Sequence, residues 1–508
     1  MRLSFDYQYD DYQDTEHWLP RLKELENIAG SARTLNASNM KEDELLDLME
    51  GLDELMTYYI YVKDYSKLEP VMRKQYELVQ LGRGMHIWHI GFQYLDMNLT
   101  RADAFLYYSN GDTVKAAEEY REAYRKAVQC KSDAEISDDL TDDQKIFVIW
   151  YCIVCICQAV EIEGKLGDTE EILQYIMTAV KFLKYIEENA EDYPGLLEKG
   201  GQYLYNFAGQ LYTFWDSPEL GRACYSRAVK WFKMLEKGEN SDIWYAVSVF
   251  TQCQNAIMEQ VHNNDDTLAG QCAALIKNEK STGISAAIIT SANGLLKAQL
   301  AISQQQKGDL SSAIATGREC SVLLEQALSQ LEKFTQNHGL KNTIVSDIGS
   351  RVYNSIVASY ELQGICYYGS DKPTEAKECL LHTQKLCARK SEFNTQNGAA
   401  AMRAENMMYL AMIATDEDDI DAVEFYAQQA ITIASEAASL TPANSYVIVC
   451  CAGIMAELCL SKKDKTSAAE YAEKGLAACG SLEGILPNIQ EMQRNLEKLK
   501  KKASRKWF

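Results

Sequence analysis

Proline and glycine are scarce in this sequence, with 7 prolines and 28 glycines among 508 residues. Both interrupt helices, proline because it lacks a backbone donor and glycine because of its conformational freedom. Ala, Leu, Glu, Lys and Gln, which are strong helix formers, dominate most of the chain. The hydrophobic fraction of 47% and the charged fraction of 24% are typical of a folded protein. The composition therefore predicts an all-α fold.

The sequence also lacks an apolar N-terminal segment and a long apolar run. Its first residues, MRLSFDYQYDDYQD, turn acidic and aromatic where the apolar part of a secretion signal would lie. The most apolar stretch, residues 146–160, is short for a bilayer span and is soon followed by Glu161 and Glu163, so we expect a buried helix. The 15 cysteines are scattered and odd in number, which indicates reduced, mostly buried thiols. These features predict a cytoplasmic protein without membrane insertion.

Positive charge is in deficit, because 51 Lys and Arg stand against 73 Asp and Glu and the net charge is −22. So acidic a chain is a poor general binder of nucleic acid or anionic lipid, and we expect no nucleic-acid partner. The exception is the tail, where the cations between Arg494 and Lys506 face Glu497 alone. We interpret the tail as the solvated end of a helix whose cations complement the helix dipole.

One pattern recurs along the chain. In GDTVKAAEEYREA, residues 111–123, the turn residue Gly111 is followed by Thr113, Ala116, Tyr120 and Ala123 at fixed offsets. Each copy is preceded by an apolar periodic stretch, which predicts a hairpin of two helices. The small residue after the turn lets the helices approach closely, and the second helix starts at Thr or Pro. The same template follows Gly167, Asp216, Gly308, Asp371 and Asp418, and weaker copies follow Lys63, Asp265 and Lys463.

The stretch YYSNGDTVKAAEEYREA, residues 107–123, resembles the second half of a tetratricopeptide repeat. FAGQLY (207–212) and LQGICYY (362–368) resemble its first helix. The resemblance covers roughly residues 45–480 in about nine units, but successive turn residues are farther apart than the family's roughly 34 residues, so the helices or turns must be longer. It implies an all-α, right-handed α-solenoid of about nine tetratricopeptide-like hairpins.

We divide the chain into three parts. Residues 1–15 form an acidic and aromatic arm, which is either disordered, packed on the first repeat or an adhesive segment for a partner. Residues 16–486 form the solenoid, which opens with helices around 16–28 and 42–62, and residues 487–508 form a capping helix with a basic tail. We expect residues 192–201 and 278–287 to be loops between units, and no second domain.

No phosphate-binding loop, nucleophile elbow, HExxH or dinucleotide fingerprint occurs in the sequence. His86 and His89 of HIWH could form half of a metal site on one helix face, but no nearby carboxylate or cysteine completes it. The cysteines of CIVCIC (152–157) lack the turn that a zinc knuckle needs and are interpreted as buried small hydrophobes. The acidic segment 415–421 is interpreted as a turn that caps the next helix rather than as a calcium loop. We predict no enzyme, no cofactor and no bound metal.

The resemblance places binding on the first helix of each hairpin, which lines the concave face in this family. With the turn residue counted as position 15, positions 2, 5, 9 and 12 face the groove. Asn206 and Asn255 share position 5 in adjacent units, and their carboxamides could pair with the backbone of an extended peptide. Alternatively, these polar side chains line a wet groove or bond between neighbouring helices. The predicted groove residues are Arg101, Tyr108, Tyr203, Asn206, Gln210, Gln252, Asn255 and Glu259.

Two functions fit these features. The first is a non-enzymatic scaffold or adaptor that binds a protein or peptide in a groove centred on residues 200–265, with aromatic contacts from Tyr203 and Tyr212. The second is a peptide-responsive regulatory or sensor protein that controls an effector by conformational change. An enzyme with an unrecognised site is less favoured, since solenoids rarely carry catalysis without an appended domain. The identity of the partner and the oligomeric state stay open.

Overall fold

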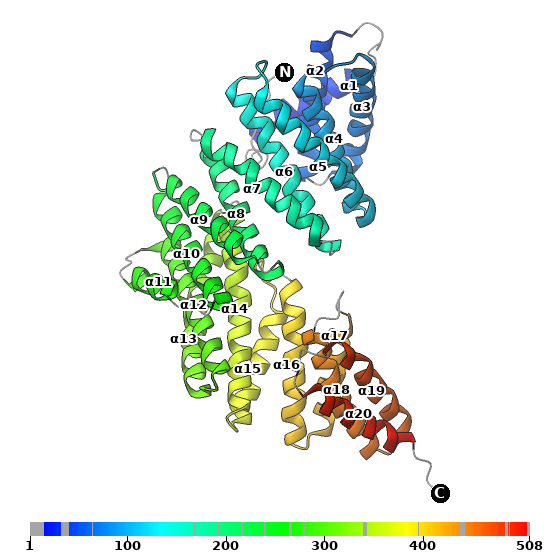
Figure 1. Ribbon diagram of the computed structural model, residues 1–508, viewed down its shortest axis with the longest axis vertical. Coiled ribbons are helices and arrows are strands. Elements are labelled where there is room, and N and C mark those ends of the chain that lie inside the picture. Colours follow the sequence, from blue (N-terminus) through cyan, green and yellow to red (C-terminus); the bar gives the residue numbers. More distant parts are fainter. Residues whose placement is uncertain are drawn as a thin grey trace. The chain divides into compact units, whose positions relative to one another are not determined.

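The computed structural model describes residues 15–504 except for short segments at 32–39, 63, 167–168, 190–192, 216, 238–239, 264–266, 278–280, 339–342, 395, 437–441, 483–485 and 487. These residues form twenty α-helices and a 3₁₀ turn at Gly480–Leu482, with no strand in the described part (Figure 1). The predicted all-α fold is confirmed. The predicted arm lies outside the described residues except at Thr15, where the first helix begins.

The helices group into two compact units, residues 1–244 and 245–508, where the sequence predicted one array with no second domain. Unit 1 contains α1 (Thr15–Ser31), α2 (Glu42–Val62), α3 (Tyr65–Gly84), α4 (Ile90–Ser109), α5 (Thr113–Ile136), α6 (Asp142–Leu166), α7 (Thr169–Asn189), α8 (Pro194–Phe214) and α9 (Pro218–Leu235). The helix α10 (Ser241–Asn263) begins at the end of unit 1. Unit 2 contains α11 (Thr267–Lys277), α12 (Gly283–Gln306), α13 (Leu310–His338), α14 (Thr343–Tyr368), α15 (Pro373–Ala388), α16 (Gln396–Asp416), α17 (Ile420–Glu436), α18 (Pro442–Ser461), α19 (Lys465–Cys479) and α20 (Ile489–Ser504).

Consecutive helices pack as hairpins within each unit. In unit 1 the pairs are α2–α3, α4–α5, α6–α7 and α8–α9, and in unit 2 they are α12–α13, α14–α15, α16–α17 and α18–α19. Within each unit, second helices also contact the first helix of the next hairpin, as α5 contacts α6 and α15 contacts α16. This is the tetratricopeptide-like arrangement that the sequence predicts. Several helices are too long for a hairpin of 34 residues. For example, α5 has 24 residues and α14 has 26.

The turn residues of the repeat adopt the left-handed backbone conformation wherever the structure describes them. The φ angle is +83° at Gly111, +78° at Gly308, +56° at Asp371 and Asp418, and +62° at Lys463. Glycine adopts this conformation without steric cost, whereas aspartate and lysine adopt it at an energetic cost. The left-handed conformation is therefore required by the reversal of the chain between the two helices. The positions that align the repeats in sequence are therefore the residues that end each first helix.

Several second helices begin with an aspartate cap, whereas α9 and α15 begin with proline and have no side-chain cap. Asp112 accepts a hydrogen bond from the backbone N–H of Lys115 at 3.2 Å, and Asp464 accepts one from that of Ser467 at 3.1 Å. The prediction that the second helix starts at Thr or Pro is confirmed at Thr113, Pro218 and Pro373. Asp112, the residue before Thr113, satisfies a backbone donor at the start of α5.

The small and aromatic residues of the repeat are packing residues, as predicted. Ala116 and Ala123 are fully buried and Tyr120 is almost so. Gly221 occupies the position of Ala116 in a later hairpin, and a Cβ atom there would lie 2.5 Å from the ring of Tyr212. The absence of a side chain thus sets the distance between α8 and α9.

The segment predicted as a loop at 192–201 is instead largely the first turns of α8, so that prediction is wrong. Gly200 and Gly201 face aromatic rings of α9: a Cβ at Gly200 would lie 2.1 Å from the ring of Trp231, and one at Gly201 would lie 2.7 Å from that of Phe232. The glycines that suggested a loop are there because the two helices meet at this point.

The last helix covers the end of unit 2, and the predicted capping helix is confirmed. In α20, Leu496 contacts Gly475 of α19, and Leu499 forms an apolar cluster with Ala456 and Ala472. Lys500 of the basic segment forms an ion pair with Glu473 at 2.9 Å. The apolar side of α20 therefore removes the final hairpin from solvent, as a terminal solenoid helix must.

Two described helices, residues 142–164 and 443–461, are long and apolar enough to cross a membrane by length and composition alone. Within the fold, 72% and 61% of their most apolar windows are buried. The predicted buried helix at 146–160 is confirmed in α6, where Cys152 and Cys155 are fully buried. The 15 cysteines are free thiols, most of them buried.

Candidate binding surface on the first helices

The first helices of successive hairpins contact one another in both units. The contacts join α2, α4 and α6 in unit 1, and α12, α14, α16 and α18 in unit 2. In the described part of the chain, the second helices of successive hairpins make no comparably extensive contact. The first helices therefore form the more closely spaced layer of each unit. We call this layer the first-helix wall of that unit.

The predicted groove residues are divided between the units and differ in exposure. In unit 1, Arg101 of α4 is buried, whereas Tyr108 of α4 and Tyr203, Asn206 and Gln210 of α8 are half-buried. In unit 2, Gln252 and Asn255 of α10 are half-buried and Glu259 is buried. The half-buried members stay candidates for ligand contact, and the two buried ones have internal partners.

Arg101 belongs to a buried polar network across three first helices of unit 1. Asp53 of α2 accepts hydrogen bonds from Tyr94 Oη at 3.2 Å and from Asn98 Nδ2 at 2.6 Å, both on α4. Asn98 Oδ1 accepts from Arg101 Nε at 2.5 Å, and Arg101 Nη1 donates to Gln158 Oε1 of α6 at 3.2 Å. The network joins neighbouring helices, which is one of the alternatives left open for the polar side chains of this face.

The charges in this network compensate each other. Burial raises the pKa of the Asp53 carboxyl to about 6, while the hydrogen bond from Asn98 and the positive charge of Arg101 act in the opposite direction. Asp53 is therefore ionised at neutral pH, and the Arg101 guanidinium balances it across Asn98. These residues hold the wall together and leave no free charge for a ligand.

The predicted aromatic contacts of unit 1 are not equivalent. The ring of Tyr203 lies 6.1 Å from that of Trp150 and stacks on Phe207 at 6.3 Å, with part of its surface exposed. Tyr212 is only 1% exposed and packs against Gly221, so the prediction that it contacts a ligand is wrong. Its ring fills the space that the repeat leaves between α8 and α9.

On α10 of unit 2, two predicted residues bond within their own helix. Gln252 Nε2 donates to the carbonyl oxygen of Ser248 at 3.2 Å, and Glu259 accepts from Asn263 Nδ2 at 2.8 Å. Asn255 lies between them and keeps a half-buried side chain.

The first-helix wall of unit 2 carries two acidic residues that the predicted set did not include. Glu361 of α14 is 7% exposed, and its Oε1 has no hydrogen-bond partner. Glu405 of α16 is half-buried. Burial, followed by the negative charge of Glu405, raises the pKa of Glu361 to about 9, and burial raises the pKa of Glu405. Among the described residues, no lysine, arginine or histidine forms an ion pair with either carboxyl.

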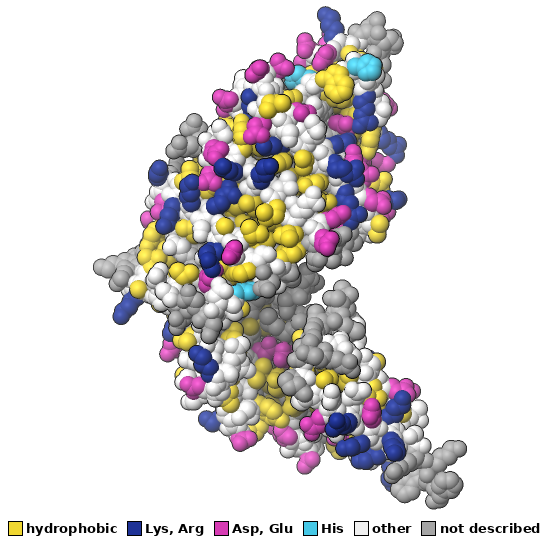
Figure 2. Space-filling view, in the orientation of Figure 1, with side chains coloured by type: hydrophobic (Ala, Val, Ile, Leu, Met, Phe, Trp, Pro, Cys, Tyr) yellow, Lys and Arg dark blue, Asp and Glu magenta, His cyan; other side chains and the backbone are white. Residues whose placement is uncertain are grey.

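Amide and aromatic side chains surround this acidic pair. Asn406 of α16 is fully buried beside Glu361 and lowers its pKa, and Asn406 Oδ1 accepts from Gln384 Nε2 at 2.9 Å. The half-buried rings of Tyr368 and Tyr409 lie 6.2 Å apart on α14 and α16. On the face shown in Figure 2, acidic and basic side chains are interspersed over both units. The acidic pair belongs to the first-helix wall of unit 2.

The repeat register already contained the signal for this pair. Counted from Asp371, Glu361 occupies position 5, the same position as Asn206 and Asn255, and Glu405 occupies position 2 when counted from Asp418. The position count therefore identifies both carboxyl groups, although only the structure shows that no described cation pairs with them.

No group of three or more metal-ligating side chains occurs among the described residues. His86 and His89 lie in the α3–α4 loop rather than on a helix face, so that expectation is wrong; His89 Nδ1 accepts the backbone N–H of Gly91 at 3.0 Å and caps α4. In the acidic turn 415–421, Asp419 accepts the N–H of Ala422 at 3.1 Å, which confirms its capping role.

No protein-family model and no curated protein matches the sequence. Among solved structures, the apo quorum sensor NprR from B. thuringiensis is 12% identical with a TM-score of 0.36, and the alignment covers 89% of this chain and 98% of that one. The apo form of RapI is 12% identical with a TM-score of 0.33, covering 90% and 98%. The human IFIT1 dimer with PPP-AAAA is 12% identical with a TM-score of 0.30, covering 91% and 95%. TM-scores this low do not support the transfer of a ligand to this chain.

Proposed function

We propose that the chain is a non-enzymatic binding protein that holds an extended segment of a protein partner on the first-helix wall of unit 2. In this proposal a lysine or arginine of the partner lies against Glu361 and Glu405. The observation that carries the proposal is the buried carboxyl of Glu361, which has an oxygen without a hydrogen-bond partner and no ion pair to any described lysine, arginine or histidine. A buried charge without a counterion is costly, so such a group is a candidate for a functional site.

A basic side chain of the partner would supply a positive charge beside Glu361. A cation close to Glu361 favours the ionised carboxylate and lowers its pKa, and charge-assisted hydrogen bonds to a guanidinium or ammonium are stronger than neutral ones. Because the pKa of free Glu361 is about 9, the carboxyl is protonated at pH 7 and must lose its proton when the cation binds. Binding is then accompanied by the release of about one proton per peptide at neutral pH.

The surroundings of the acidic pair favour a peptide over an isolated ion. The wall continues across α14, α16 and α18, and half-buried Tyr368, Tyr409 and Tyr446 present ring surface on these three helices. Aromatic side chains supply much of the affinity at peptide and protein interfaces. The half-buried Asn206 of unit 1 and Asn255 of unit 2 stay proposed secondary contacts, each within its own unit.

Selection from a displayed library of random linear peptides tests the proposal. We expect the enriched peptides to share a lysine or arginine, and Glu361→Gln to weaken their binding by at least about tenfold. The control is Glu378→Gln, which removes an exposed carboxylate of α15 in the same hairpin. Calorimetry in buffers of different ionisation enthalpy measures the released proton, which Glu361→Gln abolishes.

Two results would contradict the proposal. Enriched peptides without a shared basic residue would show that the acidic pair does not select the ligand. Equal affinity for the wild type, for Glu361→Gln and for Glu405→Gln would place the peptide elsewhere, and Asn206→Ala and Asn255→Ala would then be tested one at a time.

A peptide-responsive sensor is a narrower form of the same function. Small-angle scattering with and without the selected peptide distinguishes it from a static scaffold, because a sensor changes its dimensions on binding and a scaffold keeps them.

A further inference from the structure

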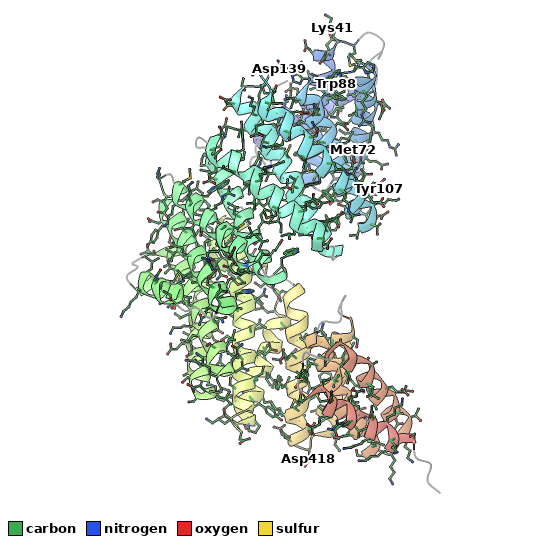
Figure 3. The ribbon with its side chains drawn as sticks, in the orientation of Figure 1. Lys41, Met72, Trp88, Tyr107, Asp139 and Asp418 are labelled. Atoms are coloured by element: carbon green, nitrogen blue, oxygen red, sulfur yellow. The ribbon has the colours of Figure 1, made fainter. Side chains whose placement is uncertain are left out.

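Unit 1 contains a partly open cavity of about 560 Å³ between α3 and α4, well away in sequence from the acidic pair of unit 2. Tyr65, Met72 and Tyr76 of α3 line it on one side, and Asp103 and Tyr107 from the C-terminal half of α4 line it on the other. Figure 3 labels Met72 and Tyr107 on the two helices. The volume lies in the range of small-molecule sites, so the lining decides what it accepts.

Asp103 is the unusual group in this lining. It is 9% exposed, and its Oδ2 is buried without a hydrogen-bond partner. The nearest charges of α5 do not neutralise it: Glu119 is acidic, and Lys126 donates to Asp96 Oδ1 and to Thr100 Oγ1, each at 2.8 Å. A carboxylate that lines a cavity without an ion-pair partner among the described residues attracts a cation and repels an anion.

The remaining charges of the cavity do not change this preference. Arg73 lies at the cavity, but its guanidinium forms an ion pair with Glu69 at 2.5 Å. That pair is exposed and neutral as a unit. No described cation forms an ion pair with Asp103, so its carboxyl adds a negative charge to the lining whenever it is ionised.

Tyrosine rings supply the second element of a cation site. Tyr65 is held beside Phe105 with ring centroids 6.1 Å apart, and Tyr76 is 43% exposed. The ammonium of Lys115 lies 5.3 Å from the ring centroid of Tyr107, so this ring already accommodates a cation on one face. Aromatic faces attract ammonium groups, and the effect is larger where water is excluded.

We propose that this cavity binds an alkylammonium group, whose nitrogen lies against Asp103 and whose carbon chain packs on Met72 between the tyrosine rings. A free alkylamine and the side chain of a lysine in another protein present the same chemistry. The site goes beyond the proposed function, because it lies in the other unit and involves none of the same residues.

Binding to the full chain is measured by calorimetry or ligand-detected NMR with three probes. Butylamine carries the ammonium alone, Nα-acetyl-lysine methylamide carries it on a peptide-like backbone, and butan-1-ol is a neutral analogue. We expect both amines to bind and the alcohol to bind at least about tenfold more weakly. Binding of butylamine but not of the lysine derivative assigns the site to free amines, and preference for the lysine derivative assigns it to a protein side chain.

Two variants identify the cavity as the place of binding. Asp103→Asn removes the charge without changing the shape, and we expect it to weaken amine binding by about tenfold or more. Tyr107→Leu removes an aromatic ring from the same wall of the cavity, one helical turn from Asp103 on α4, and is expected to weaken binding about threefold. The control is Asp139→Asn, because Asp139 is exposed between α5 and α6 (Figure 3).

Amine binding also depends on pH in a defined direction. Burial, reinforced by Glu119, raises the pKa of Asp103 to about 7, and Lys126 opposes this. Since only ionised Asp103 attracts the ammonium, the affinity should fall about tenfold between pH 8 and pH 6. The other charges at the cavity are Glu69 and Arg73 of α3.

The proposal is overturned if the amines bind Asp103→Asn as tightly as the wild type, if butan-1-ol binds as well as butylamine, or if no amine binds the folded chain. Tighter binding of methylguanidine than of butylamine would overturn the assignment to ammonium. Circular dichroism of each variant establishes that it is folded. The peptide experiments on Glu361 have a separate readout, so either proposal can fail without the other.

Discussion

Replacing Glu361 with glutamine should stabilise unit 2 at neutral pH. The carboxyl of Glu361 is buried in α14 near Glu405, and its pKa rises from an ordinary value of 4.5 to about 9. The unfolded chain exposes this group and ionises it freely at pH 7, whereas the folded chain must keep it protonated. Glutamine has nearly the same shape and carries no charge in either state, so the variant avoids this cost.

The magnitude follows from the two pKa values. Holding a carboxyl protonated costs about 1.4 kcal/mol for each pH unit above its unfolded pKa, which gives about 3 kcal/mol at pH 7. Because the folded pKa lies above the unfolded one, the folded state binds the proton more tightly, and wild-type stability falls as pH rises from 4.5 towards 9. The advantage of Glu361→Gln should therefore shrink to less than about 1 kcal/mol at pH 5.

Urea unfolding followed by circular dichroism at pH 5 and pH 7 measures this difference. Native-state hydrogen exchange locates it, because amides of α14 and α15 should gain protection while those of α4 in unit 1 serve as an internal reference. The tryptophans give a second reference, since six of the seven lie within residues 1–244. A gain seen by hydrogen exchange only in unit 2 would tie the effect to Glu361.

Glu378→Gln in the same hairpin is the matched control, since its carboxylate is exposed and should contribute little at either pH. The reasoning would be refuted if Glu361→Gln were no more stable than the wild type at pH 7, or if its effect were the same at pH 5. The variant also separates binding from folding. A more stable protein that no longer binds the selected peptides has lost the ligand contact and not its structure.

Three further predictions concern unit 1. Gly200→Ala should destabilise the chain by roughly 1–3 kcal/mol, because the new methyl group would overlap an aromatic ring of α9. Gly164 of α6 has open space around it, so Gly164→Ala should stabilise the chain by up to about 1 kcal/mol. The urea unfolding midpoints of the two variants measure these changes. Asp112→Ala removes the cap of α5 and should cost about 1 kcal/mol, with Asp112→Asn retaining most of it, as thermal melts would show. Arg101→Met should cost about 1–3 kcal/mol at pH 7, and less at pH 5 where Asp53 is protonated; a loss independent of pH would mean that the two charges do not interact.

The repeat made most of the fold predictable. Close packing of two helices requires small residues at fixed intervals, so Ala116 and Ala123 could be identified as core residues from the sequence alone. Tyr120 could be identified in the same way, because it lies on the same face of the helix between them. The bounds of the helix predicted at 42–62 agree with α2 because its apolar periodicity begins and ends with the helix. The error at Gly200 has the opposite cause. A glycine that makes room for a ring on another helix cannot be told from a loop glycine without knowing where that ring lies.

For the candidate site, the sequence predicted only which positions of each first helix to consider. The position count named Arg101 and Glu259 as groove residues, but burial and hydrogen bonding depend on which side chain the neighbouring helix places opposite. The prediction that Tyr212 contacts a ligand was wrong for the same reason. A rotation of α8 about its axis by a fraction of a turn decides whether this tyrosine faces solvent or the next helix. Asp103 had no signal in the sequence, since its missing partner is a property of three helices together.

The same two positions of the repeat have opposite electrostatic outcomes in the two units. In unit 1, position 5 carries Asp53 in one hairpin and Arg101 in the next, and Asn98 at position 2 connects them. In unit 2, positions 5 and 2 carry Glu361 and Glu405, two carboxyl groups without an ion pair to a described cation, and Glu361 is protonated at pH 7. A solenoid repeats its geometry but not its charges, so one site can hold a carboxylate that an arginine balances through a shared asparagine, while the equivalent site elsewhere holds a carboxyl without a described cation. The uncompensated place is where a partner gains most by bringing the missing charge, and this is the physical reason for proposing the unit 2 wall as the binding surface.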